Sequence, residues 1–357
     1  MASLLPHGVS RRAALAGLAG WAACAGLPAR AAVPTVLAQP AVITPKALGA
    51  AMLAVTRAGA RLVAVGERGT VLLSDDHGQH WKQAAVPVQA TLTCVTFANE
   101  RSGWAAGHLG AILRTEDGGQ TWRKQLDGIA AAALAMTAAE RSGDATAIAA
   151  ARRLVEEGAD KPFFDLEFVD AQRGFAAGAY GLMFSTSDGG QNWAPWNARL
   201  PNPKSLHLYG VRANGSTVVV AGEQGLLLRS TDGGAQFASL ASPYKGSFFG
   251  LLRTRGGALV AHGLRGSAYR SVDDGAHWDK LDSGLPTTLA AGLAMPSGGF
   301  VLVSQSGDVL MARDDAGVLQ RIPAREPVPV AGAALAADGA LVLASLRGMR
   351  RLPALNS

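Results

Sequence analysis

An eight-residue turn motif occurs five times in this chain of 357 residues, and it constrains the fold more than any other feature. Each copy reads Ser/Thr-x-Asp-x-Gly-x-x-aromatic, and the copies occupy residues 74–81, 115–122, 186–193, 230–237 and 271–278. Neighbouring copies lie about 41 to 44 positions apart, except for one interval of about 71. A period near 40 residues, with short strand-like segments between the turns, is typical of a β-propeller. The repeat therefore predicts an all-β propeller fold.

The motif is the Asp-box, and its residue types suit a structural role. The Asp carboxylate accepts hydrogen bonds within its own turn, and Gly adopts a backbone conformation that side chains resist. The aromatic residue then buries a large apolar face near the blade edge. The residues concerned are Asp76, Asp117, Asp188, Asp232 and Asp273, with Trp81, Trp122, Trp193 and Trp278 at the aromatic position. We expect these aspartates to stabilise turns and not to catalyse a reaction.

A second kind of turn indicates the number of blades. Each repeat carries a short Gly/Ser-x-x-Gly turn between its second and third expected strands. These turns occupy residues 66–69, 107–110, 178–181, 222–225, 263–266, 304–307 and 345–348. Seven turns predict seven blades. The last repeat lacks an outer strand, and we expect residues 41–44 to supply it and to close the ring.

The long interval between the second and third motif copies predicts a helical insertion at about residues 129–160. This segment is rich in Ala, and Ile148 and Val155 recur at helical spacing. Asp144 is suited to cap a second helix, and Gly158 is suited to end it. We therefore expect a helical hairpin between blades two and three. It is either a surface decoration or a lid or docking arm over one face.

Residues 1–31 have the pattern of an export signal, which leaves residues 32–357 for the propeller. Arg11 and Arg12 precede an apolar run, and residues 29–31 offer a small-x-small cleavage site, so we expect cleavage near Ala31. Residues 10–15 resemble the twin-arginine export motif, with the general secretory route as the alternative. The expected location of the mature protein is the periplasm.

Charge and cysteine content exclude several classes of function. The formal charge of +6 falls to about +3 when the three signal arginines are removed. This net charge is too low to indicate a nucleic-acid-binding surface. Cys94 is then the single cysteine, so no intrachain disulfide is expected, and its apolar strand pattern predicts a core position. Cys24 allows a lipoprotein alternative, although Trp21 stands where a lipobox has Leu. No second apolar segment is long enough to span a membrane.

The third position of the seven short turns carries the candidate partner-binding residues. These turns line one face of a propeller, and three of them place an arginine there: Arg68, Arg265 and Arg347. Converging guanidinium groups suit the carboxylates of a partner or of an anionic ligand. Tyr180 and Gln224 occupy the same position in blades three and four and belong to the same candidate surface. The alternative is a set of unrelated, solvated side chains on exposed turns.

A sialidase-like glycoside hydrolase is the enzymatic alternative, because Asp-boxes also occur in sialidases. Such a site needs an arginine triad, a Tyr nucleophile with a carboxylate partner and an acid/base Asp. Tyr180 lies on a suitable turn, but no Glu is placed beside it, and Arg321 fits a turn between blades better than a triad. No metal-ligand spacing, phosphate loop or nucleophile elbow occurs. We therefore expect no catalytic residue, no metal and no cofactor.

Two repeats carry a resemblance to a known family. Residues 95–122 contain Gly-Trp-Ala-Ala-Gly before their Asp-box, and residues 164–193 contain Gly-Phe-Ala-Ala-Gly before theirs. This pattern resembles the photosystem II stability/assembly factor family of exported seven-bladed propellers with BNR (Asp-box) repeats. The resemblance covers almost all of the chain after the signal.

This resemblance implies a non-catalytic scaffold that binds a membrane-complex subunit through an arginine-rich patch. Arg68, Arg265 and Arg347 are the positions that match the patch. Residues 154–163 resemble non-photosynthetic proteobacterial relatives, which accompany exporters of the resistance-nodulation-division type. The implied protein is a periplasmic accessory or assembly factor whose partner is a membrane-complex or exporter subunit. A glycan- or anion-binding module stays open as the alternative.

Overall fold

The computed structural model describes residues 34–322 and 326–355. The export signal predicted for residues 1–31 lies outside the described residues. Within the described part, 27 strands form seven antiparallel sheets, six with four strands and one with three. Each sheet uses strands that follow one another along the chain, with the first strand of the repeat at one edge. The seven sheets confirm the predicted seven-bladed propeller.

The first four blades contain 16 of these strands. Blade one consists of β1 (Met52–Ala58), β2 (Arg61–Gly66), β3 (Val71–Ser74) and β4 (Lys82–Gln83), and blade two of β5 (Leu92–Phe97), β6 (Gly103–Gly107), β7 (Ile112–Thr115) and β8 (Arg123–Leu126). Blade three consists of β9 (Phe163–Phe168), β10 (Gly174–Gly178), β11 (Met183–Thr186) and β12 (Ala194–Pro195). Blade four consists of β13 (Leu208–Asn214), β14 (Thr217–Gly222), β15 (Leu227–Ser230) and β16 (Ala238–Ser239).

The last three blades complete the set. Blade five consists of β17 (Phe248–Arg253), β18 (Leu259–Gly263), β19 (Ala268–Ser271) and β20 (Asp279–Lys280). Blade six consists of β21 (Leu289–Ala294), β22 (Phe300–Ser304), β23 (Val309–Ala312) and β24 (Gln320–Ile322). Blade seven consists of β25 (Val330–Leu335), β26 (Ala340–Ser345) and β27 (Gly348–Ala354).

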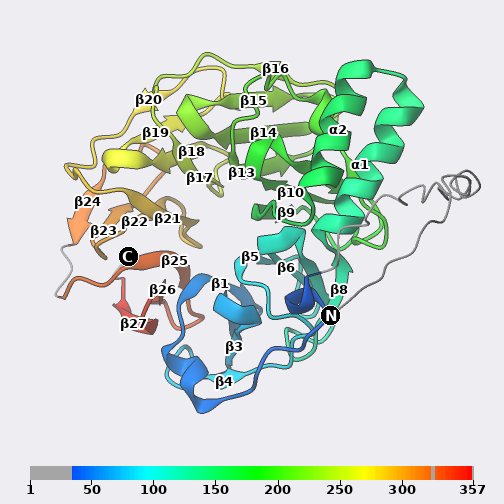
Figure 1. The fold of residues 1–357 in the computed structure, drawn as a ribbon. Helices are drawn as coiled ribbons and strands as arrows, with labels where there is room; N and C mark the ends of the chain where they lie inside the picture. The colour runs from blue at the N-terminus through cyan, green and yellow to red at the C-terminus, as the bar shows by residue number, and fades with distance from the viewer. Residues whose placement is uncertain (1–33, 323–325, 356–357) are drawn as a thin grey trace, which may run out of the picture. The chain divides into compact units, whose positions relative to one another are not determined.

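The first strand of every blade lies at the centre of the ring (Figure 1). Each of these innermost strands packs against the innermost strand of the next blade, and β25 of blade seven packs against β1 of blade one. Because neighbouring strands are antiparallel, the short turns between second and third strands share one face with the loops that enter the innermost strands. We call this the turn face. The Asp-box turns lie on the opposite face, the Asp-box face.

The core lies between the sheets and is built largely from second strands. All residues of β6, β10, β18, β22 and β26 are buried. Large aromatics fill the space between blades two and three, where the rings of Trp104 and Phe168 stack with centroids 3.5 Å apart. Cys94 is also buried, which raises the pKa of its thiol and makes it an inert core residue. Strands buried on both faces explain the small, apolar second-strand pattern.

The prediction that residues 41–44 complete blade seven is wrong. The sheet of β25, β26 and β27 keeps three strands in the described part of the chain. Ala41 instead donates its backbone N–H to the carbonyl of Val86 at 2.9 Å, and the side chain of Gln83 donates to the carbonyl of Val42 at 3.0 Å. The segment is therefore hydrogen-bonded to blade one. The ring closes by side-chain packing between β1 and the sheet of β25 and β26.

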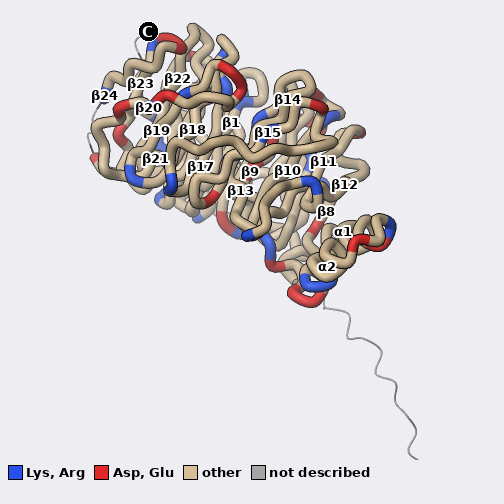
Figure 2. The backbone as a smooth tube through the Cα atoms, turned by 90° about the horizontal axis from the view of Figure 1, so that it is seen from above, with Lys and Arg blue, Asp and Glu red and all other residues tan. Residues whose placement is uncertain are grey.

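The predicted helical insertion is present between blades two and three. Helices α1 (Gly128–Ser142) and α2 (Ala145–Glu157) connect β8 to β9, so the hairpin ends earlier than the predicted residue 160. The Asp144 carboxylate caps α2 by accepting from the N–H of Thr146 at 2.7 Å, and Gly158 follows the last turn. Figure 2 shows the hairpin at the outer edge near β8 and β12, with basic and acidic positions along it. Neither described helix is both long and apolar enough to cross a membrane.

The remaining helical segments are single 3-10 turns. Three lie outside the repeat pattern: η1 (Thr35–Leu37), η2 (Pro45–Gly49) and η6 (Asn197–Arg199). The other five are the short turns of blades one to five: η3 (Glu67–Gly69), η4 (His108–Gly110), η5 (Ala179–Gly181), η7 (Glu223–Gly225) and η8 (Leu264–Gly266).

Candidate partner-binding face

The turn face presents a set of non-glycine residues in a conformation that normally favours glycine. The middle residues of η3, η4, η5, η7 and η8 have positive φ angles between 52° and 59°. They are Arg68, Leu109, Tyr180, Gln224 and Arg265. A left-handed backbone strains residues that carry a Cβ atom, and such strain is often found at functional positions. In blades six and seven the positive φ falls on Gly307 and Gly348, so Arg347 is not strained in this way.

Hydrogen bonds hold these turns rigidly. The N–H of the first turn residue donates to the carbonyl that precedes the innermost strand, as in Glu67 to Ala51 at 2.9 Å and Leu264 to Ser247 at 3.0 Å. In three blades the N–H of the strained residue reaches a side chain of the next blade. These bonds join Arg68 to Thr91 Oγ1 at 3.4 Å, Tyr180 to His207 Nδ1 at 2.9 Å and Gln224 to Ser247 Oγ at 3.3 Å. The turns are therefore fixed within their blades, and those of blades one, three and four are also bonded to the next blade.

The three candidate arginines are exposed and carry unpaired charges. Within the described residues, none of the guanidinium groups of Arg68, Arg265 and Arg347 is in an ion pair, and all three residues are exposed. In contrast, Arg212 is paired with Asp165. The ring order places the turns of blades five, six, seven and one side by side, with Ser306 of blade six between two of the arginines. Unpaired guanidinium groups on rigid turns suit recognition of carboxylates.

A feature that the sequence reasoning missed lies beside these turns. All seven innermost strands have a β-bulge at their second residue, where one extra residue interrupts the register with the second strand. The bulged residues are Leu53, Thr93, Phe164, Tyr209, Phe249, Ala290 and Ala331. A bulge re-aims its side chain away from the regular alternation of the strand. The bulged positions lie at the turn-face end of the innermost strands and form a second ring of residues.

In blades one to five a glycine ends the second strand and admits the close approach of the loop that enters the innermost strand. In blades six and seven a serine ends the second strand, and the bulge is present there too. A Cβ atom on Gly66 would lie 2.1 Å from the carbonyl oxygen of Ala51, and on Gly178 it would lie 2.3 Å from that of Pro162. The loop that enters the innermost strand therefore approaches the second strand as closely as a backbone can. The sequence carries a partial signal of this ring of bulged residues, because the second residue of three successive innermost strands is aromatic where the other repeats have Leu, Thr or Ala.

Charged residues of the innermost strands bridge blades three and four. Arg212 Nη1 lies 2.6 Å from Asp165 Oδ2 and 3.8 Å from Glu167 Oε2. Burial raises the pKa of Glu167, while Arg212 opposes that effect. These groups satisfy one another, so their primary role is to join β9 to β13.

The Asp-box residues take part in their own turns. Oδ1 of Asp76 accepts from the Ser74 hydroxyl at 2.8 Å and from the backbone N–H of His80 at 2.9 Å. The backbone hydrogen bond from His80 is the largest cause of a strongly lowered pKa of Asp76. Asp117, Asp188, Asp232 and Asp273 accept equivalent bonds. The indoles of Trp81, Trp122 and Trp278 donate to a glycine carbonyl of the same turn, and Trp193 is buried against blade two.

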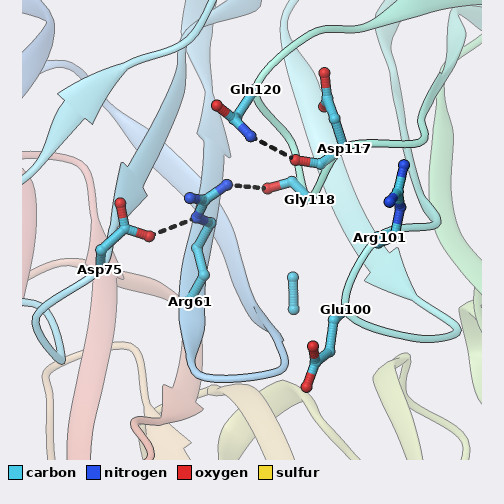
Figure 3. A pocket seen from close by; sticks show the side chains of 8 residues that line it. Arg61, Asp75, Glu100, Arg101, Asp117, Gly118 and Gln120 are labelled. Carbon is cyan, nitrogen blue, oxygen red and sulfur yellow. Dashed lines mark hydrogen bonds and ion pairs between the residues drawn. The ribbon is translucent and has the colours of Figure 1, made fainter.

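A polar cavity of about 450 Å³ lies between blades one and two on the Asp-box face (Figure 3). Several of its polar groups are already engaged. Arg61 lies 2.6 Å from Asp75 and donates to the carbonyl of Gly118 at 3.1 Å. The same contact recurs between other blades, since Arg114 donates to the carbonyl of Gly189 and Arg351 to that of His77. The cavity is one copy of a repeated blade seam, and we do not assign a ligand to it.

The residues considered for a sialidase-like site do not assemble. Arg321 lies in the outer strand β24, not in a turn between blades, and pairs with Asp308 at 3.2 Å. No carboxylate is hydrogen-bonded to the Tyr180 hydroxyl in the described part of the chain. Instead, the Lys161 ammonium lies 4.9 Å from the centre of the Tyr180 ring. Residues 34–322 and 326–355 contain no group of three His, Cys, Asp or Glu side chains placed to hold a metal ion.

Comparison with known proteins identifies the family. The sequence matches the family described as photosynthesis system II assembly factor YCF48 over residues 73–161 and 145–316. The chain belongs to this family. One segment of 76 residues is 34% identical to the photosystem II assembly lipoprotein Ycf48 of Synechococcus sp. (strain CC9902). That segment spans 21% of this chain and only 23% of the relative.

Solved structures of Ycf48 share the fold. The structure described as YCF48 bound to D1 peptide has a TM-score of 0.63 and 16% identity, covering 89% of this chain and 97% of that one. YCF48 from Cyanidioschyzon merolae has a TM-score of 0.52 and 17% identity, covering 74% and 85%. A virginiamycin B lyase from Staphylococcus aureus has a TM-score of 0.65 at 10% identity, covering 87% and 96%. At these identities the likeness shows the propeller fold and does not separate binding proteins from enzymes.

Proposed function

We propose that this Ycf48-family protein is a non-catalytic accessory or assembly scaffold. It binds an extramembrane segment of a membrane-complex subunit through the turn face. The observation that carries the proposal is the set of exposed, unpaired guanidinium groups of Arg68, Arg265 and Arg347 on that face. Tyr180 and Gln224 extend the same surface across blades three and four. A family member described as bound to a D1 peptide supports a polypeptide ligand.

A non-catalytic role fits the state of the candidate enzymatic residues. Arg321 is engaged with Asp308, and the Tyr180 ring contacts Lys161 and His207. We further propose that residues 1–31 direct the chain to the periplasm and are removed near Ala31. A subunit of a resistance-nodulation-division exporter is the client favoured by the resemblance of residues 154–163.

Crosslinked affinity capture from whole membranes tests the scaffold proposal. The test variant carries Arg68→Ala, Arg265→Ala and Arg347→Ala. The matched control removes three exposed arginines of the Asp-box face, with Arg57→Ala, Arg255→Ala and Arg313→Ala. Both variants change the net charge equally. We expect wild type and control to capture the same membrane protein, and the turn-face variant to lose it, with capture weakening as salt is raised.

Two results contradict the proposal. Equal capture by wild type and the turn-face variant would show that the arginines do not bind the partner. Capture of no membrane protein by any variant would count against a scaffold, and calorimetry with purified sugars and small anions would then test the glycan- or anion-binding alternative. Cell fractionation tests the location, since the cleaved chain is expected in the periplasm and Arg11→Lys with Arg12→Lys is expected to block twin-arginine export.

A further inference from the structure

The seven bulged residues of the innermost strands differ in side-chain type between one part of the ring and another. In blades three, four and five the bulged residues are Phe164, Tyr209 and Phe249, whereas blades six and seven have Ala290 and Ala331. Three successive blades therefore place aromatic rings at the turn-face end of the central strands. The two following blades place only methyl groups there. This division is not required by the fold, because the bulge itself occurs in all seven blades.

The aromatic bulge residues join two further rings to form one continuous row. The Tyr180 ring contacts His207 with centroids 4.7 Å apart, and His207 contacts Tyr209 at 5.9 Å. Tyr209 contacts Phe164 at 5.1 Å and Phe249 at 5.2 Å. The row crosses blades three, four and five. We call Phe164, Tyr180, His207, Tyr209 and Phe249 the aromatic crescent.

The crescent does not belong to the core of the blades. The residues that precede the bulges, such as Leu208 and Phe248, are completely buried and supply that core. Tyr180 is 59% exposed and Phe249 is 37% exposed, and the other three rings are half-buried. Contiguous exposed aromatics on a folded protein mark an interaction surface. Aromatic side chains also supply much of the binding energy at protein interfaces.

Two cations beside the crescent are paired with acidic side chains. Lys161 lies over the Tyr180 ring and is paired with Asp160 at 2.6 Å and with Glu157 of α2 at 2.8 Å. Arg212 is paired with acidic side chains of β9. Exposed, unpaired cations of the turn face include Arg265, Arg347 and Arg68 on the turns of blades five, seven and one. Lys204 and Lys245, in the loops that enter β13 and β17, are also exposed. The face therefore has an aromatic part on blades three, four and five and the three arginines on blades five, seven and one, so the two parts meet at blade five.

We infer that the turn face binds an extended acidic peptide that also carries apolar side chains, and that these apolar side chains contact the aromatic crescent. This inference rests on the proposed binding function and adds the chemistry of the ligand. Carboxylates of the peptide meet Arg265, Arg347 and Arg68. In an extended chain, side chains on the same side recur about every 6.6 Å. The ring-to-ring steps of the crescent are somewhat shorter, at 4.7 to 5.9 Å, so alternate apolar side chains of the peptide lie along the row without a one-to-one match to the rings.

Selection from a library of short random linear peptides, displayed on phage, tests the inference without knowledge of the client. The crescent variant carries Tyr180→Ser and Phe249→Ser, the two most exposed members. The matched control carries Val272→Ser and Val318→Ser, which are exposed apolar residues of the Asp-box face. Equal thermal unfolding midpoints of all proteins establish that each is folded. The arginine variant described above is selected in parallel.

We expect wild type and control to enrich peptides that combine Asp or Glu with aromatic or aliphatic residues. The crescent variant should keep the acidic preference and lose the apolar one, with binding of the wild-type peptides weakened about tenfold or more. The arginine variant should show the converse. A wild-type selection of acidic peptides without apolar preference, or an unchanged selection by the crescent variant, overturns the inference and leaves the arginine proposal intact. Selection of no peptide by wild type overturns the inference, while membrane capture decides the scaffold proposal separately.

Discussion

Replacing a strained turn arginine by glycine is expected to stabilise the fold while removing a binding group. Arg265 has φ 55° and ψ 41°, a left-handed conformation that costs a residue with a Cβ atom about 1–2 kcal/mol. Glycine relieves this strain but loses about 0.5–1 kcal/mol more conformational entropy on folding. We therefore expect Arg265→Gly to raise the free energy of unfolding by about 0.5–1 kcal/mol.

Alanine at the same position separates the backbone effect from the side-chain effect. Arg265→Ala keeps the strain and removes only an exposed, unpaired side chain, so its stability is expected to stay within about 0.5 kcal/mol of wild type. Arg68 has nearly the same geometry, with φ 52° and ψ 33°, and lies in another blade. The effects of Arg68→Gly and Arg265→Gly are therefore expected to add, giving about 1–2 kcal/mol together.

Urea unfolding followed by tryptophan fluorescence measures the stability of the Arg, Ala and Gly forms, and membrane capture measures binding by the same proteins. The double Gly variant should be the most stable and should capture as little partner as the double Ala variant. Glycine forms that are less stable than the alanine forms would refute the strain argument. A stabilised glycine form that keeps full capture would instead refute the binding role of the arginines.

Three further predictions concern the framework of the site. Gly266→Ala places a Cβ atom 1.9 Å from the carbonyl oxygen of Leu285 at φ 69°, so the free energy of unfolding should fall by about 3 kcal/mol or more in the same urea assay. Burial lowers the pKa of His262 from about 6.5 to about 4, so the unfolded chain takes up this proton first as the pH falls. This histidine should therefore lower the free energy of unfolding by up to about 3 kcal/mol between pH 6.5 and 4, and His262→Gln should show a smaller drop over the same range. Arg212→Ala leaves Asp165 without its ion-pair partner, with the backbone N–H groups of Val211 and Leu166 still bonded to it, and should cost about 3 kcal/mol. An unchanged urea midpoint would show that this bridge is not stabilising.

The fold and part of the candidate site could be predicted from the sequence because the motifs that specify them are short and repeated. The Asp-box needs only one turn to form, since Asp76 is bonded to Ser74 and His80 of the same eight residues. The helix caps at Asp144 and Gly158 are equally local, and they placed the boundaries of α2 correctly. The seven short turns gave the number of blades. These features need no distant partner, so a pattern in the sequence was enough to predict them.

The sequence by itself thus determined a seven-bladed propeller with a helical insertion and a face that carries Arg68, Arg265 and Arg347. Tertiary structure alone decided that residues 41–44 bind blade one, because their backbone hydrogen bonds reach residues about 40 positions away. It also decided the register of the bulges, which depends on pairing between whole strands. Contacts between blades then bring Phe164, Tyr209 and Phe249 into one row. The aromatic residues themselves are visible in the sequence, but long-range pairing has no local signature, so only the folded ring shows that they form one row.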